Sequence, residues 1–360
     1  MNKEQRALLA LLRAGLWERS LDDLSDFPLS AESWRQVLCL SRQQTVTGLV
    51  FQGLQYLADE MMPPESVLIH WAAEVDAIER SNRKMNKALA DLLAMFKAKG
   101  LNPVLQKGQG LALLYEQPLL RECGDIDLYF NNDKAWEMAL CHVRLHGICV
   151  KNEPDQSGFY RWQGIEVEHH PFLFDLYNPF LRCLANKLEQ KWGYRHCMVS
   201  EAMEVMVPAP FLNLLLIDLH ILKHALGRGI GLRQLCDMAR ACYCLHSEIN
   251  SYEMKEACRS LGLERWNPLL HTFMVEYLGL PVTCLPYSEQ ARSAHSLLDI
   301  VWRGGNFGQY MAKRKECDAR SVWTRKWQTL CSFLRNMNFS CHYAPKEAFW
   351  LVLRLLKGQF

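Results

Sequence analysis

The sequence predicts a mixed α+β fold in which a small sheet region lies between two helical regions. Leu and Trp recur at helical spacing through most of residues 1–98. From Leu101 the pattern changes to short apolar runs separated by turn residues, which is typical of strands. After about residue 180, long apolar stretches at helical spacing return. The predicted order is therefore helical, α/β and helical, over 360 residues that are enough for two or three domains.

The first region, 1–98, is expected to contain only helices. Proline residues interrupt it at Pro28 and again at Pro63 and Pro64. The predicted helices cover 5–17, 31–41, 46–58 and 66–98.

The second region, 99–205, is expected to form the α/β core. Residues Lys107 to Gly110 predict a turn after a first strand, and Asp125 to Phe130 alternate as a strand does. Asp133 is expected to cap a helix that runs to about His146. The other predicted elements are strands at 102–106, 148–150, 159–162 and 165–170 and a short helix at 111–115.

Beyond about residue 180 the chain is expected to turn helical. Pro208 and Pro210 open a long apolar helix that ends near Gly227, inside a predicted helical lobe over 206–300. A basic, tryptophan-containing region over 301–360 follows it. The other predicted helices cover 232–247, 251–278, 287–302, 320–338 and 345–357.

Composition excludes several classes of protein. The formal net charge of +2 provides no global attraction to polyanions. The 14 cysteines include no CxxC pair, and the apolar start of the chain is broken by Arg13, unlike a secretory signal. No run reaches the roughly 18 apolar residues that span a bilayer. We therefore expect a cytoplasmic protein with reduced thiols and no transmembrane segment.

Acidic side chains follow two of the predicted strands. Because side chains alternate faces along a strand, Asp125 and Asp127 share one face, about 6–7 Å apart. On a later strand Glu166, Glu168 and His170 also share a face. If the two strands are neighbours, a third carboxylate joins the first two.

Such a group of carboxylates is suited to hard divalent cations. Mg²⁺ prefers oxygen ligands and usually takes one or two carboxylates, with water and substrate phosphates completing its shell. Three carboxylates can hold two ions about 3.5–4 Å apart, one activating a hydroxyl and the other neutralising charge on a triphosphate. The pattern predicts a site for Mg²⁺ or Mn²⁺.

These residues resemble the uncharacterised nucleotidyltransferase family of the DNA polymerase beta superfamily. That superfamily has a strand, a Gly-Ser turn, a helix and a strand with Asp-x-Asp, followed by an acid on a later strand. The matching segments are 107–108, 121, 124–128 and 167–170, which read Lys-Gly, Arg, Gly-Asp-Ile-Asp-Leu and Val-Glu-His-His. The resemblance is strongest over 100–180 and looser over 30–98 and 205–245. It implies a minimal polymerase-beta-type nucleotidyltransferase sheet flanked by helical segments.

The resemblance also implies roles for individual residues. The catalytic metal ligands would be Asp125, Asp127 and Glu168, which would hold two Mg²⁺ or Mn²⁺ ions. Glu168 is favoured over Glu166 because it keeps the family's spacing to His170.

The residues implied to bind the phosphates of an NTP are Lys107, Gly108, Arg121 and Gly124. Gln109 stands where the superfamily has serine, so Lys107 and backbone N–H groups would supply the phosphate contacts. An alternative for Arg121 is an ion pair with Asp125 or Asp127.

Further candidates are expected to line the substrate cleft, namely His170, His224, Arg233 and Asp237. His220 and His224 lie four residues apart on one helix, but no third ligand is evident and buried, hydrogen-bonded histidines are the simpler interpretation. His169 points away from the acids and is expected to be structural.

The function implied by the resemblance is transfer of a nucleoside monophosphate from an NTP to an unknown acceptor, as in surface polysaccharide or metabolite synthesis. One alternative is a toxin-type nucleotidyltransferase that modifies tRNA or protein, and another is an inactive module that only binds nucleotide. Residues 303–360 contain eleven Lys or Arg, three acids and three tryptophans, Trp323, Trp327 and Trp350. They predict either a helical cap or weak contact with RNA or an anionic membrane surface.

Overall fold

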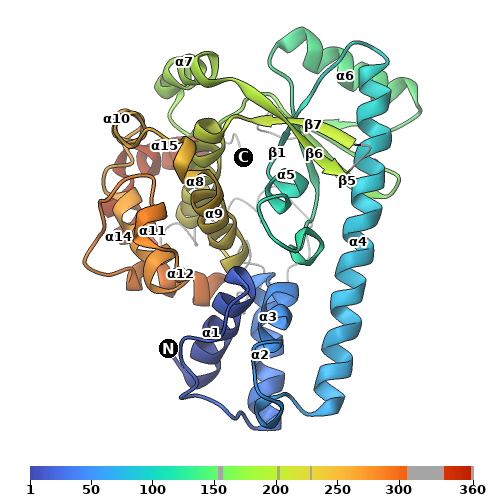
Figure 1. Ribbon diagram of the computed structural model, residues 1–360. Coiled ribbons are helices and arrows are strands. Elements are labelled where there is room, and N and C mark those ends of the chain that lie inside the picture. The colour runs from blue at the N-terminus through green and yellow to red at the C-terminus, as the bar shows by residue number, and fades with distance from the viewer. Residues whose placement is uncertain (153–156, 201–202, 228, 306–335, 358–360) are drawn as a thin grey trace.

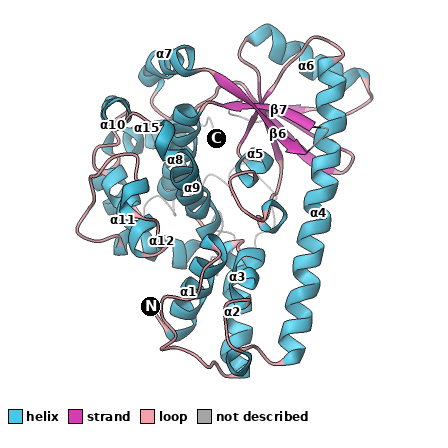
Figure 2. Cartoon of the chain, viewed as in Figure 1, coloured by secondary structure: helices cyan, strands magenta, loops and turns pink. Residues whose placement is uncertain are grey.

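The computed structural model describes residues 1–360 except 153–156, 201–202, 228, 306–335 and 358–360. The fold is mixed α+β, as predicted, with one seven-stranded sheet and helices packed on both of its faces (Figure 1). Figure 2 shows the strands gathered at one end of the molecule and helices making up most of the rest.

The N-terminal region is helical, as its periodicity predicts. Its elements are α1 (Lys3–Trp17), α2 (Ala31–Gln44), α3 (Thr47–Leu54), a 3-10 turn at Asp59–Met61 and α4 (Glu65–Lys97). Asn2 caps α1 and Ser30 caps α2, because each side chain accepts a hydrogen bond from a backbone N–H of the first turn.

The sheet has the strand order β3-β4-β5-β2-β1-β7-β6. Its strands are β1 (Val104–Gln106), β2 (Ile126–Tyr129), β3 (Lys151–Asn152), β4 (Gly158–Trp162), β5 (Ile165–His170), β6 (Tyr194–Ser200) and β7 (Met203–Pro208). The central strands β1 and β2 pair antiparallel, whereas β2 pairs parallel with β5. The connections between strands contain α5 (Gly108–Ala112), α6 (Asp133–Leu145), α7 (Arg182–Trp192) and 3-10 turns at Pro118–Leu120 and Pro179–Leu181.

The remaining helices form a second helical part beside the sheet, visible in the left half of Figure 1. Helices α8 (Pro210–Gly227) and α9 (Leu232–Leu245) lie nearest to the sheet. The others are α10 (Ser251–Ser260), α11 (Trp266–Glu276), α12 (His295–Gly304), α14 (Met337–Tyr343) and α15 (Pro345–Lys357), with 3-10 turns at His246–Glu248 and Val282–Cys284.

Two hydrophobic cores hold these parts together, and α4 contributes to both. Trp71, in its first half, is fully buried in the larger core, which joins the N-terminal and C-terminal helices. Leu89 and Phe96, in its second half, pack with Leu128 and Val167 in a smaller core under the sheet. The face of β2 and β5 that carries Leu128 and Val167 is therefore covered by α4 and α6, and the opposite face carries the acids.

Several local expectations were wrong. No strand forms at 148–150, since β3 begins at Lys151, and the helix expected over 287–302 begins only at His295. The chain does not turn wholly helical after residue 180, because β6 and β7 form a hairpin that joins the sheet beside β1. Alternating burial along β7, from Met203 onward, shows that this segment carried the two-residue period of a half-exposed strand. Asn132, not Asp133, caps α6, since its side chain accepts the Ala135 N–H at 2.8 Å.

The basic C-terminal region is described only in part. The predicted helix at 320–338, with Trp323 and Trp327, lies almost entirely outside the described residues. Helix α15 matches its predicted bounds and packs on the body of the protein, with Ala348 and Leu351 buried in the larger core. No helix among the described residues combines the length and apolar character needed to cross a membrane.

The second helical part contains a buried acidic side chain, Asp218. Asp218 of α8 is 2% exposed and accepts a hydrogen bond from Trp266 Nε1 at 2.6 Å. Burial raises the pKa of Asp218 to about 7, although the hydrogen bonds from Trp266 and Asn267 oppose the shift. The folded state therefore binds a proton on Asp218 at pH values where an unfolded chain has released it.

We expect the free energy of unfolding to fall between about pH 4 and pH 7 through Asp218, because its pKa is higher in the folded state. Asp218→Asn removes this titration and keeps an acceptor for Trp266, so it should stabilise the protein relative to wild type more at pH 8 than at pH 5. Urea unfolding at the two pH values measures the difference, with the exposed Asp59→Asn as control. An Asp218→Asn effect that is the same at both pH values would contradict the assignment.

Candidate active site

The sheet register places polar side chains in a row across three strands. Gln106 of β1 lies opposite Asp127 of β2 in the antiparallel pair, and Asp127 lies beside Glu168 of β5 in the parallel pair. Paired residues of neighbouring strands point to the same face, so their side chains converge. Ile126 and Val167, one position earlier on each strand, point to the opposite face and are fully buried in the sheet core.

Asp127, Glu168 and His170 form a compact cluster. One possible ligand atom from each lies within 4.8 Å of the others, which is the spacing of groups around a metal ion. His170 Nε2 is 2.6 Å from Asp127 Oδ1, and His170 Nδ1 is 3.7 Å from Glu168 Oε1. Two carboxylates and an imidazole are a donor set that divalent cations such as Mn²⁺ and Mg²⁺ accept.

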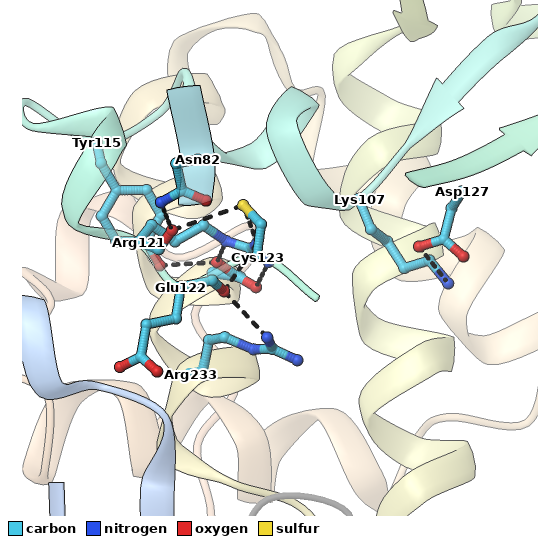
Figure 3. Close-up of polar contacts among 9 residues, drawn as sticks. Asn82, Lys107, Tyr115, Arg121, Glu122, Cys123, Asp127 and Arg233 are labelled. Carbon is cyan, nitrogen blue, oxygen red and sulfur yellow. Dashed lines mark hydrogen bonds and ion pairs between the residues drawn. The ribbon is translucent and has the colours of Figure 1, made fainter. Parts of the chain in front are cut away.

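Lys107 reaches the cluster from the bend between β1 and α5. Its Nζ lies 3.4 Å from Asp127 Oδ2, and Figure 3 shows the two side chains pointing toward each other. Burial alone would raise the pKa of Asp127, but the charges and hydrogen bonds of Lys107 and His170 outweigh it and hold this pKa below its usual range. Asp127 is therefore ionised, with two basic groups as its partners.

The bend itself has unusual backbone geometry. Lys107 has φ 46° and Gly108 has φ 42°, both in the region that favours glycine. A Cβ atom at Gly108 would also lie 3.3 Å from the carbonyl oxygen of Asp125, which is tighter than most contacts of real side chains. Strain of this kind costs on the order of 1–3 kcal/mol at a non-glycine residue, and here it aims the Lys107 amine at Asp127.

Asp125 does not belong to the compact cluster, in contrast to the predicted trio of Asp125, Asp127 and Glu168. It precedes the first residue of β2, and its side chain is exposed. The negative charge of Asp127, followed by partial burial, raises the pKa of Asp125 to about 6. Asp125 therefore lies at the rim of the cluster, near enough to feel its charge, and His170 takes the third place within it.

The alternative acid, Glu166, lies elsewhere. It is paired with Arg161 of β4, with a distance of 2.9 Å between Arg161 Nη2 and Glu166 Oε1. Of the two glutamates, only Glu168 is set beside Asp127 by the strand register. His169 points into the sheet core, as expected, where its Nε2 lies 2.8 Å from the Tyr160 hydroxyl and burial lowers its pKa to about 3.

Arg121 and Asp237 are ion-pair partners of each other, whereas the ion pair considered for Arg121 from sequence was with Asp125 or Asp127. Arg121 donates two hydrogen bonds to Asp237, from Nε at 2.9 Å and from Nη2 at 2.7 Å. Tyr115 donates a third at 2.8 Å, and both charged side chains are about 95% buried or more. Figure 3 shows Tyr115 and Arg121 set apart from Lys107 and Asp127. Arg121 thus forms a buried ion pair with Asp237. The phosphate-binding role of Arg121 and the place of Asp237 in a substrate cleft stay predictions.

The structure gives different surroundings to the other sequence-derived candidates, Arg233, Gly124 and His224. Arg233 donates to the Glu122 carbonyl oxygen at 3.0 Å, and its charge acts on both Asp125 and Arg121. Gly124 is exposed, and a Cβ there would meet no atom within 4 Å, so no steric contact requires glycine. His224 packs against His220, with ring centroids 4.4 Å apart.

A recess opens beside the cluster on the side of α8. It is partly open to solvent. Gln106, Lys107 and His170 form the edge that it shares with the cluster, and the segment 171–176 forms another wall. The recess has other basic side chains, which were not predicted as site residues, namely Arg182, His220 and Arg354. In the sequence, only the pair His220 and His224 pointed to these side chains. Arg354 is far from the other lining residues along the chain, and only the folded structure brings it and Arg182 to the recess.

We expect Arg121→Met to destabilise the protein by about 3–5 kcal/mol, because it leaves Asp237 buried without its cationic partner. Arg83→Met is the matched control, since Arg83 forms an exposed ion pair with Glu79 at 2.6 Å, a kind of pair that contributes at most about 1 kcal/mol. Urea unfolding measures both. A stable Arg121→Met protein with weakened nucleotide binding would instead restore the role predicted from sequence.

One of three comparisons with known proteins found a match. The family model described as uncharacterised nucleotidyltransferase matches residues 30–279, which include the sheet, the acidic cluster and Lys107. A comparison with curated proteins found no match, and neither did a comparison with solved structures. The match covers more than half of the chain, so the protein belongs to the uncharacterised nucleotidyltransferase family.

Proposed function

We propose that this protein is a metal-dependent nucleotidyltransferase that moves a nucleoside monophosphate from an NTP to a hydroxyl acceptor. The observation that carries the proposal is the position of Asp127 beside Glu168, with the Lys107 amine 3.4 Å from Asp127. Family membership supports nucleotidyl transfer in general. The acidic cluster supports a metal-assisted reaction of this type in particular.

The residues present fit divalent cations. Asp127 and Glu168 supply hard carboxylate oxygens, His170 is close enough to coordinate or orient them, and Asp125 lies at the rim. The repulsion between Asp125 and Asp127 that raises the pKa of Asp125 would be relieved by added positive charge. Bound Mg²⁺ or Mn²⁺, with two ions expected, would lower the pKa of the attacking hydroxyl and neutralise charge on the phosphates.

Lys107 is placed to bind the phosphates of the NTP. Its amine sits at the edge between the acidic cluster and the recess, where Asp127 compensates its charge. When a cation binds the carboxylates, this amine can turn to a phosphate oxygen. Gly108 lets the backbone bend closely past Asp125, and Gly124 leaves open space on the other side of that acid.

The reaction then follows from positioning. The acceptor oxygen attacks the α-phosphorus as the bond to the β-phosphate oxygen breaks, so acceptor and nucleotide are joined and pyrophosphate leaves. The hydroxyl proton is released. Lys107 holds negative charge that develops on the phosphates, and Arg233, whose charge acts on Asp125, adds to the positive potential there.

We expect purified protein with α-labelled NTPs, Mg²⁺ or Mn²⁺ and host lysate to transfer label to an acceptor, whose size a gel and thin-layer chromatography will reveal. Asp127→Asn should reduce the transfer at least 100-fold, because it removes a carboxylate from the centre of the cluster. EDTA should abolish it. Glu166→Gln is the matched control on the neighbouring strand, since Glu166 pairs with Arg161, and it should retain activity.

Two outcomes would contradict the proposal. Transfer that survives Asp127→Asn would place the chemistry elsewhere. Saturable nucleotide binding with no transfer from any of the four NTPs would support the inactive nucleotide-binding module instead.

A further inference from the structure

The recess beside the acidic cluster is strongly basic. Its lining includes the cations Lys107, Arg182 and Arg354. Two histidines also line it, His170 and His220, and burial holds the pKa of His220 well below its usual range, so His220 is neutral. Asp175 is the single acid among the lining residues, and it forms an ion pair with Lys223. The recess therefore has an excess of positive charge directly next to carboxylates that would hold cations.

Arg182 and Arg354 approach the recess from separate helices. The Arg182 guanidinium lies over the Phe172 ring, 4.3 Å from its centroid, at the start of α7. Arg354 Nη2 donates to the Leu176 carbonyl oxygen at 3.0 Å. Both residues line the recess, and burial, followed by the charge of Arg354, lowers the pKa of Arg182. Bringing two such cations together costs free energy that a bound anion would recover.

Hydrogen bonds hold helix α15, which carries Arg354, against the segment that follows the recess wall. Glu347, only 5% exposed, accepts hydrogen bonds from the backbone N–H groups of Tyr177 at 2.8 Å and Asn178 at 3.3 Å. The Glu347 carboxylate is thus engaged by the backbone of the segment after the recess wall. Arg354 then follows two turns later on the same helix. This helix lies beyond residues 30–279, the span that matches the family.

We propose that Arg182 and Arg354 form a phosphate-binding subsite for the acceptor, so that the acceptor of the nucleotidyl group is a phosphorylated molecule. The proposal rests on the nucleotidyltransferase function proposed above. A phosphate in the recess would receive charge-assisted hydrogen bonds from the two guanidinium groups, the donors best suited to it. The acceptor would then extend past His170 to the acidic cluster. In this proposal Arg354 determines specificity for the phosphorylated acceptor. It belongs to helix α15, which lies outside the residues that match the family.

The direct test is titration of the full chain with inorganic phosphate by calorimetry at pH 7.5. We expect saturable binding to the wild type and at least a tenfold weaker affinity in both Arg182→Gln and Arg354→Gln. Lys346→Gln is the matched control, because Lys346 lies on the same helix, is exposed and does not line the recess. Circular dichroism and thermal melts establish that the variants are folded. Because Arg182 and Arg354 lie on different helices, a loss of phosphate affinity in both variants cannot be explained by disturbed packing of a single helix.

A second arm distinguishes the acceptor's phosphate from the phosphates of the NTP. Phosphate is titrated again in the presence of Mg²⁺ and saturating α,β-methylene-ATP, and likewise with the analogues of the other three NTPs. Unchanged phosphate affinity supports an acceptor subsite, whereas competition, or weaker nucleotide binding in Arg354→Gln, assigns the recess to the nucleotide and overturns the proposal. Absence of phosphate binding to the wild type, or equal binding to all variants, overturns it as well. Since the titration needs no turnover, its failure is separable from failure of the transfer assay.

Discussion

The parallel pairing of β2 with β5 is the constraint on which the candidate site depends, because it sets Asp127 beside Glu168. A shift of one residue in this register would place Val167 or His169 there and move the acids to the core face. The apolar side chains on that face prevent the shift, since Ile126, Leu128 and Val167 are fully buried against α4 and α6. The chemistry of one face is thus held in place by packing on the other.

Charge compensation shapes the rest of the site. Asp127 is almost completely buried, and Lys107 and His170 supply the positive partners that make its ionised form tolerable. The recess beyond them has the opposite imbalance, with Arg182 and Arg354 both in its lining. The acidic cluster and the basic recess thus lie next to each other, and they share Lys107 and His170 at their border. Such an arrangement suits a ligand that brings cations to the cluster and anionic groups to the recess.

Much of the fold and the centre of the site could be predicted from sequence, because the relevant signals are local. The alternation around Asp127 and Glu168 showed two strands with acids on one face, and helical spacing revealed most helices. The partner of Arg121 could not be predicted, since Asp237 is 116 residues away and only the folded chain brings them together. The same holds for Arg354, which reaches the recess by the docking of α15. Asp125 differed because the strand begins one residue after it, so strand alternation no longer controls its side chain.

Helix α4 has a mechanical consequence for how the molecule can move. Its 33 residues span about 50 Å, and they contain neither proline nor glycine, the residues at which helices usually bend. One half of α4 is buried in the larger core and the other half in the smaller core under the sheet. This helix therefore connects the helical part to the sheet. A rigid-body rotation of the helical part away from the sheet would expose the buried α4 side chains of one of these cores to solvent. We therefore expect the recess to open through side chains and connecting segments around it rather than through a hinge between the two parts.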